Sequence, residues 1–149
     1  SRLLSDLCGR PLRLVRSEVP GQGMDMYPVS ILSESSLEEL NRGPGAYGGF
    51  EESRFRPNLL LTGCVPYQEE EWVGQSLRIG DELRMSIVER NERCSLTTVN
   101  PATGTRDKDT LRAIISYRGE AYLGVYAEVE APGPLRVGDT VEVMGKSKS

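Results

Sequence analysis

The sequence predicts a mainly β domain with a few short helices, closed into a β-barrel. Several short runs alternate apolar with polar residues and are separated by glycine and proline turns, as in barrels and sandwiches. Only two or three stretches have helical spacing, and there is no internal repeat and no βαβ rhythm. The length of 149 residues fits one domain with a single core.

Alternation and β-branched content define the predicted strands. Pro28 opens the second of them, because proline is tolerated at the first residue of a strand. The run from Leu96 to Val99 is included for its β-branched residues, before a turn at 100–104. The predicted strands are 12–14, 28–32, 58–62, 77–79, 83–87, 96–99, 122–129 and 141–143.

Three helices are predicted. The first covers 3–7, with Gly9 placed where a helix C-terminus favours glycine. The second begins at Ser35 or Ser36, runs through Leu40 and carries carboxylates in its first turn, where the helix dipole favours them. The third covers about 107–117. The glycine-rich stretch after the second helix predicts a loop.

Composition excludes several classes of function. The net charge of −4 argues against a general nucleic-acid binder, and no run approaches the roughly 18 apolar residues of a membrane span. The absence of histidine removes His-based triads and imidazole metal ligands. Three cysteines without CxxC spacing predict neither a disulfide framework nor a zinc knuckle, which favours a reducing compartment such as the cytoplasm.

The segment 54–58, Arg-Phe-Arg-Pro-Asn, is the first candidate for ligand binding. Arg54 and Arg56 flank an aromatic residue, and Pro57 fixes the backbone just before an apolar strand. A guanidinium held in this way suits bidentate binding of phosphate. The alternative from residue chemistry is a surface arginine pair with Phe55 in the core.

Cys94 is the candidate for thiol chemistry. Arg93 precedes it directly, and nearby positive charge stabilises the thiolate, the form that attacks electrophiles and binds soft metals. The alternative is a buried structural cysteine at the start of a strand. Cys8 and Cys64 have no comparable neighbours and are interpreted as structural or incidental.

The acidic run of Glu69, Glu70 and Glu71 predicts a solvated face, and Trp72 after it a packing residue at the rim of the domain. Neither is a predicted site.

Six segments in chain order resemble the MOSC domain, named from the C-terminal part of molybdenum cofactor sulfurase, and in particular the amidoxime-reducing and YcbX-like branch of that family. They span nearly the whole chain, and the Phe-Arg-Pro-Asn and Arg-Cys-x-Leu-Thr-Thr-Val motifs are the most specific. The segments are 27–37, 54–58, 70–72, 77–80, 93–104 and 136–139.

The resemblance implies a β-barrel that binds molybdenum through a pyranopterin dithiolene. The family's metal-binding cysteine falls on Cys94, which would be both metal ligand and catalytic residue. Arg56 and Asn58 would hold the cofactor, and Arg93 with Arg56 would offset its negative charge. Residues just before the first motif strand also approach the cofactor in relatives, which nominates Asp25, Met26 and Tyr27.

The activity implied by the resemblance is an oxidoreductase that reduces small N-hydroxylated substrates. Electrons would come from a cytochrome b5-type or flavin/iron–sulfur partner, and a eukaryotic source would imply mitochondrial association. A sulfur carrier with a persulfide on Cys94, serving metal–sulfur cluster or cofactor sulfuration, is the second hypothesis. A plain interaction module is the third, and it requires Cys94 to be fully buried and away from any arginine-lined cleft.

The sequence departs from the family pattern in two respects. Relatives carry an additional N-terminal β-barrel segment that contributes cofactor contacts, so residues 1–149 are expected to be a MOSC fragment that binds the cofactor weakly or not at all without it. Some relatives also have a second cysteine three positions before the metal ligand, where this chain has Asn91.

Overall fold

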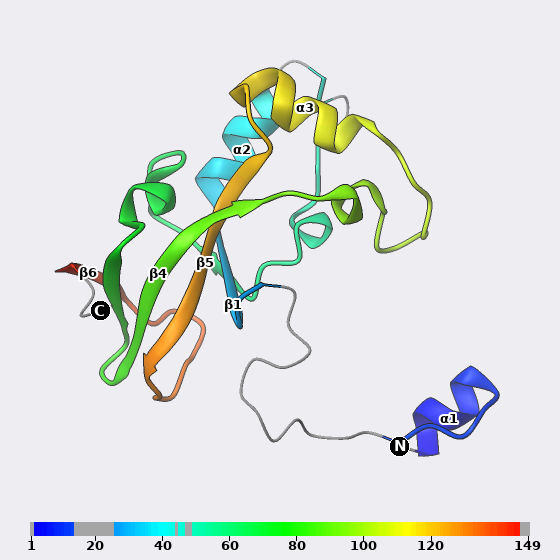
Figure 1. The fold of residues 1–149 in the computed structure, drawn as a ribbon, viewed down its shortest axis with the longest axis horizontal. Helices are drawn as coiled ribbons and strands as arrows, with labels where there is room; N and C mark the ends of the chain where they lie inside the picture. Colours follow the sequence, from blue (N-terminus) through cyan, green and yellow to red (C-terminus); the bar gives the residue numbers. More distant parts are fainter. Residues whose placement is uncertain (1, 14–25, 44, 47–48, 147–149) are drawn as a thin grey trace.

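Six strands form one curled sheet, a half-barrel, which confirms the mainly β prediction (Figure 1). The computed structural model describes residues 2–13, 26–43, 45–46 and 49–146. The sheet has the order β2-β1-β5-β4-β3-β6. Its strands are β1 (Val29–Ser33), β2 (Leu59–Leu61), β3 (Gln75–Ile79), β4 (Leu83–Glu92), β5 (Tyr122–Ala131) and β6 (Val141–Lys146).

Two helices gather at one end of this sheet, α2 (Glu34–Arg42) and α3 (Asp109–Arg118) (Figure 1). Ser33 caps α2, because its hydroxyl accepts a hydrogen bond from the N–H of Ser36. The helix α1 (Arg2–Cys8) has no buried residue and lies apart from the sheet (Figure 1). In the described residues no helix has the length and apolarity needed to cross a membrane. Three short 3₁₀ helices complete the described elements: η1 (Glu52–Arg54), η2 (Gln68–Trp72) and η3 (Ser95–Thr98).

The pairing of β1 with β2 corrects one sequence-based expectation. These strands are parallel, with Ile31 opposite Leu59, and the chain between them passes through α2. The sheet therefore contains one βαβ-type connection, although the sequence showed no βαβ rhythm. A single crossover produces no repeating pattern, and the other strand pairs of the described sheet are antiparallel.

The core has two parts that lie on opposite faces of β1. Ile31 belongs to the cluster inside the sheet with Leu77, Ile87 and others, whereas Leu32 belongs to the cluster beneath α2 and α3. Neighbouring residues of a strand point to opposite faces, so β1 separates the two clusters. The helices α2 and α3 therefore pack against β1, the strand whose first residues line the candidate site.

A β-bulge at Gly124 changes the face that β5 presents. The β4–β5 register shifts between the pairs Arg90–Val125 and Glu92–Tyr122, and Gly124 has a φ of +74°. A left-handed glycine is typical of a bulge, which bends the strand. Leu123 consequently packs under the helices while Val125 packs inside the sheet, although residues two apart normally share a face.

The predicted strand over 96–99 is wrong, because the segment forms η3 instead. The sulfur of Cys94 accepts a hydrogen bond from the N–H of Leu96, and the hydroxyl of Thr97 donates to the carbonyl of Cys94. These local hydrogen bonds compete successfully with the β propensity of the threonines. The predicted strand over 12–14 is also absent at residues 12 and 13, and residue 14 lies outside the described residues.

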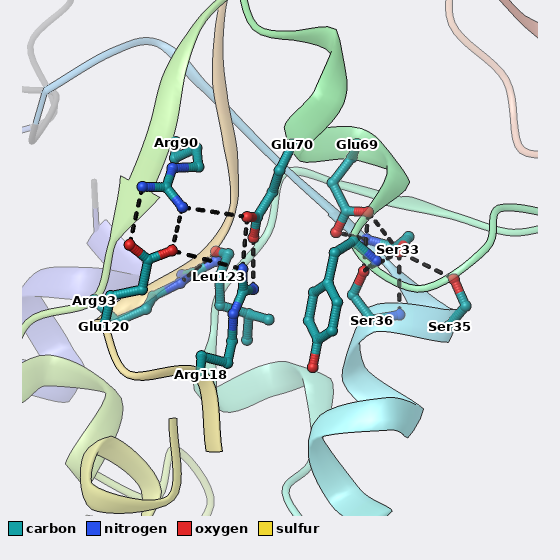
Figure 2. Close-up of polar contacts among 11 residues, drawn as sticks. Ser33, Ser35, Ser36, Glu69, Glu70, Arg90, Arg93, Arg118, Glu120 and Leu123 are labelled. Atoms are coloured by element: carbon teal, nitrogen blue, oxygen red, sulfur yellow. Dashed lines mark hydrogen bonds and ion pairs between the residues drawn. The ribbon is translucent and has the colours of Figure 1, made fainter. Parts of the chain in front are cut away.

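Two of the three carboxylates of the acidic run, those of Glu69 and Glu70, are buried, which corrects the prediction of a solvated face, and only Glu71 is exposed. Glu69 is fully buried and accepts hydrogen bonds from the Ser33 hydroxyl (2.8 Å), the Ser33 N–H (3.1 Å) and the Ser36 hydroxyl (2.9 Å). Glu70 forms a bidentate ion pair with Arg118, both at 2.7 Å (Figure 2). Partners more than 30 residues away satisfy these carboxylates, and a single sequence does not reveal such partners.

Candidate functional site

Most of the predicted site residues meet at a pocket of about 230 Å³ on the sheet. The start of β1, the loop before β2, the end of β4 and one residue of β5 form its walls. Its lining residues are Tyr27, Pro28, Ser30, Arg54, Phe55, Arg56, Asn58, Asn91, Glu92, Arg93, Cys94, Leu96, Thr97 and Tyr126. Three arginines face one carboxylate among them, so the pocket is locally cationic in a chain whose net charge is −4.

Strand pairing brings these segments together. Ser30 of β1 lies opposite Tyr126 of β5, and the carboxamide oxygen of Asn58 accepts hydrogen bonds from the Ser30 N–H (2.8 Å) and hydroxyl (2.9 Å). The N–H of Asn58 in turn donates to the carbonyl of Ser30 (2.9 Å). Asn58 therefore fastens the arginine-bearing loop to the start of β1.

Cys94 presents an exposed thiol at the point where β4 ends and η3 begins. It lines the same pocket as Arg54, Arg56 and Arg93. The interaction-module hypothesis required a fully buried cysteine away from any arginine-lined cleft. That requirement is not met, because the thiol is exposed and lies beside three arginines.

Arg93 is the buried arginine of the pocket, with 6% of its surface exposed. Its Nε donates to the carbonyl of Leu123 (2.8 Å) and its Nη1 to the carbonyl of Phe55 (2.8 Å). Its Nη2 is buried and has no hydrogen-bond partner within the described part of the chain. Burial lowers the pKa of Arg93 to about 10. An unpaired buried donor is costly in a native protein, so this nitrogen favours an acceptor supplied by a ligand.

Arg56 contrasts with Arg93, because it is exposed and its backbone is strained. Its φ is +50°, in the left-handed region that non-glycine residues rarely adopt, at a cost of about 1–2 kcal/mol. Such strain is typical of ligand-binding segments. The carbonyl of Arg56 accepts a hydrogen bond from the Ser30 hydroxyl (3.3 Å), which helps to hold this conformation.

Arg54 and Asp107 connect the pocket wall to α3. Nη1 of Arg54 donates to Asp107 Oδ2 (2.6 Å) and to the Thr110 hydroxyl (3.2 Å). The other oxygen of Asp107 accepts hydrogen bonds from the N–H groups of Asp109 and Thr110 at the start of α3. Burial alone would raise the pKa of Asp107, but the hydrogen bonds from Arg54 and Thr110 outweigh it and hold the pKa below its usual value.

The Asp107→Asn variant is expected to lose stability at neutral pH but not in strong acid. Because the pKa of Asp107 is lower in the folded chain, its carboxylate stabilises the fold above the unfolded pKa of about 3.9, and this contribution disappears as the pH falls through the folded pKa. Urea unfolding of wild type and variant at pH 7 and at about pH 2–3 checks this. A difference in unfolding free energy that is as large in acid as at pH 7 contradicts it.

Five of the seven predicted site residues line the pocket together: Tyr27, Arg56, Asn58, Arg93 and Cys94. Met26 is 64% exposed and is not a lining residue, and Asp25 lies outside the described residues.

Sequence reasoning missed the lining residue Tyr126, whose ring centroid lies 5.6 Å from that of Tyr27. Nothing in a strand pattern distinguishes Tyr126 from a packing residue. Asn91, 3% exposed, also lines the pocket, at the position noted as lacking a second cysteine.

Comparison with known proteins identifies the family of the chain. The model of the MOSC domain family matches residues 19–142. The chain is 38% identical to mitochondrial amidoxime-reducing component 1 of Mus musculus over 82% of the chain, and 37% identical to that of Homo sapiens over 82%. It is 32% identical to molybdenum cofactor sulfurase of Drosophila grimshawi over 89% of the chain.

The chain spans only part of these relatives, 38% of the length of the two amidoxime-reducing components and 19% of the sulfurase. Among solved structures, YuaD of Bacillus subtilis is similar with a TM-score of 0.60 at 18% identity, over 80% of this chain and 64% of that one. YiiM of Geobacillus stearothermophilus gives a TM-score of 0.58 at 18% identity, over 78% and 53%. These structures show the fold alone, whereas the family model, which matches most of the chain, and the relatives above 30% identity show that the chain belongs to the MOSC domain family.

Proposed function

We propose that this chain is the part of a molybdenum-dependent oxidoreductase that holds the metal end of a pyranopterin cofactor, with Cys94 as the protein ligand to molybdenum. The observation that carries the proposal is the position of Cys94. Its exposed thiol shares a pocket with three arginines, one of which is buried with an unpaired Nη2. A soft thiolate suits a metal already bound to sulfur, and guanidinium groups suit the anionic parts of the cofactor.

The donor set fits a cofactor-bound metal better than a free one. In the described residues no group of three or more Cys, Asp or Glu side chains is placed to hold a metal ion. Cys94 alone would leave a bare ion without a coordination sphere. A metal that arrives with its own sulfur ligands needs only one further ligand from the protein, and the exposed thiol of Cys94 is able to supply it.

The volume of the pocket sets a limit on what this chain holds by itself. Ligand sites usually measure about 300–1,000 Å³, and this pocket of about 230 Å³ is smaller. It therefore suits one end of a large cofactor. We propose that residues 1–149 form a MOSC unit whose site is completed by another segment, in line with the 38% of the relatives' length that the chain spans.

Several of the lining residues have a role that their geometry supports. The exposed guanidinium of Arg56 and the Nη2 of Arg93 would pair with anionic oxygens. Asn58 would act mainly by fixing the loop to Ser30, because its carboxamide oxygen already accepts two hydrogen bonds from Ser30. Tyr27 would form an aromatic wall with Tyr126, and Met26 and Asp25 belong to the proposed cofactor contacts of the preceding segment.

The cofactor, when bound, would supply two-electron reduction of small N-hydroxylated substrates with loss of the oxygen as water. The protein's contribution is to hold and orient it. We propose an electron donor of cytochrome b5 or flavin/iron–sulfur type, as the similarity to amidoxime-reducing components implies. A cytoplasmic or mitochondrial location is part of the same proposal, and the relatives named above as amidoxime-reducing components carry a mitochondrial name.

The Cys94→Ser variant tests the proposal in the complete protein. We expect the variant to lose reductase activity toward N-hydroxylated compounds at least about 100-fold, because the oxygen of serine is a poor substitute for a thiolate at a soft metal. Molybdenum analysis and activity are measured together, with Cys8→Ser as the matched control at another exposed thiol. Full activity and full molybdenum content in Cys94→Ser contradict the proposal.

A sulfur carrier is the second candidate, and two observations favour it. The thiol of Cys94 is exposed, as a persulfide carrier requires, and the chain is 32% identical to a molybdenum cofactor sulfurase. Incubation with a cysteine desulfurase and free cysteine, followed by mass spectrometry, distinguishes the two functions. An added sulfur atom on Cys94 but not on Cys8 supports the carrier, and its absence in a protein that contains molybdenum supports the reductase.

A further inference from the structure

Arg54 is held in one orientation at the edge of the pocket. Only 13% of its side chain is exposed, and Nη1 is fixed by Asp107 (2.6 Å) and Thr110 (3.2 Å). Thr110 is fully buried, so it anchors the guanidinium to the interior of the domain. A guanidinium that is already ordered loses less conformational entropy when a ligand binds.

The remaining donors of Arg54 are available to a ligand. Both of its contacts use Nη1, and within residues 2–13, 26–43, 45–46 and 49–146 neither Nε nor Nη2 makes a hydrogen bond. Arg54 lines the pocket together with Cys94. Nη1 of the planar guanidinium is thus bound by Asp107, and the N–H groups of Nε and Nη2 remain free. This arrangement suits recognition of a carboxylate.

Asp107 links Arg54 to the segment that carries Cys94. Its N–H donates to the carbonyl of Thr98 (2.8 Å), the last residue of η3, and Val99 bridges to Arg106 just before it. Asp107 therefore contacts the segment after the thiol through its backbone and Arg54 through its side chain. This makes Asp107 a positioning residue that fixes Arg54 relative to the segment following Cys94.

We propose that Arg54, oriented by Asp107, is an anion-binding residue of the pocket. It selects ligands in which a carboxylate lies close to the group that contacts Cys94. Under the proposed reductase function, on which this substrate class rests, the preferred N-hydroxylated substrates are those with a carboxylate. The anion site itself does not depend on that function, because it consists only of residues of this chain.

Alkylation of Cys94 by two small reagents tests the anion site without any cofactor. Iodoacetate and iodoacetamide both react by displacement of iodide by the thiolate, but only iodoacetate carries a carboxylate. The ratio of their rates at one cysteine cancels differences in thiolate content and access. Peptide mass spectrometry of the purified chain gives this ratio for Cys94 and, as an internal reference, for the exposed Cys8.

We expect the iodoacetate-to-iodoacetamide ratio at Cys94 to exceed that at Cys8, and Arg54→Gln to reduce it roughly two- to fivefold, the effect of one partly exposed ion pair. Arg54→Lys keeps the positive charge but loses the planar guanidinium, and it should give an intermediate ratio. Arg112→Gln on the exposed face of α3 is the matched control and should leave the ratio unchanged.

Three results overturn the proposal. An unchanged ratio in Arg54→Gln excludes Arg54 as an anion-binding residue, and an equal decrease in Arg112→Gln attributes the effect to the overall charge of the chain. A wild-type ratio in Arg54→Lys shows that positive charge alone is sufficient and excludes recognition by an oriented guanidinium. None of these results affects the molybdenum content of Cys94→Ser, so failure of this inference and failure of the reductase proposal are distinguishable.

Discussion

Replacing Glu69 with alanine is expected to lower the free energy of unfolding by about 3–5 kcal/mol. The carboxylate is fully buried and accepts hydrogen bonds from the hydroxyls of Ser33 and Ser36 and from the N–H of Ser33. Its loss leaves these three donors without their acceptor in the interior. At the size of this chain, each kcal/mol corresponds to a change of roughly 2–4 °C in Tm.

Glu71→Ala is the matched control, because Glu71 lies in the same 3₁₀ turn and is exposed. Its free energy of unfolding should stay within about 0.5 kcal/mol of wild type. Urea unfolding followed by circular dichroism measures both variants. If Glu69→Ala is no less stable than Glu71→Ala, the buried cluster does not stabilise the fold as its geometry indicates.

Gly124→Ala is expected to destabilise the chain by about 2–5 kcal/mol and to disturb the pocket. The new Cβ would overlap the backbone carbonyl of Ile31, which belongs to the paired strand β1 and does not move easily. It would also lie 3.3 Å from Nη2 of Arg93. The positive φ of Gly124 adds strain to this overlap.

Gly119→Ala separates the backbone strain of a positive φ from the steric overlap of the new Cβ. Gly119 has a φ of +76°, close to the +74° of Gly124, but in the described residues no atom beyond its chain neighbours lies within 4 Å of the position that a Cβ would take. Gly119→Ala therefore measures the backbone strain alone, about 1–2 kcal/mol. Thermal unfolding of both variants gives the difference. Equal losses of stability would show that the strand pair accommodates the methyl group and that Arg93 is not confined there.

The pocket residues that the sequence predicted share one property. Arg56, Asn58, Arg93 and Cys94 lie in two short motifs whose order along the chain is recognisable, and Tyr27 directly precedes a motif strand. The fold places these segments at the start of β1, before β2 and at the end of β4, which is why they converge.

The features that the sequence did not predict depend on partners distant in the chain. Asp107 lies 53 residues from Arg54, and Glu69 lies 36 residues from Ser33, so no local pattern indicates either contact. The bulge at Gly124 was not predicted either, because a glycine inside a strand only permits a bulge, and the pairing of β4 with β5 decides whether one forms. At 96–99 the decisive contacts are local instead. Hydrogen bonds to the carbonyls of Cys94 and Ser95 stabilise a 3₁₀ helix where β propensity favoured a strand.

The number of sulfur atoms bound to molybdenum tests the central claim most directly. X-ray absorption at the molybdenum edge is measured on the complete, cofactor-containing protein and on its Cys94→Ser variant, with Cys8→Ser as control. If Cys94 is the protein ligand, the wild type and the control have one more sulfur neighbour than Cys94→Ser. The same sulfur count in all three proteins would contradict ligation by Cys94, and with it the proposed role of the pocket.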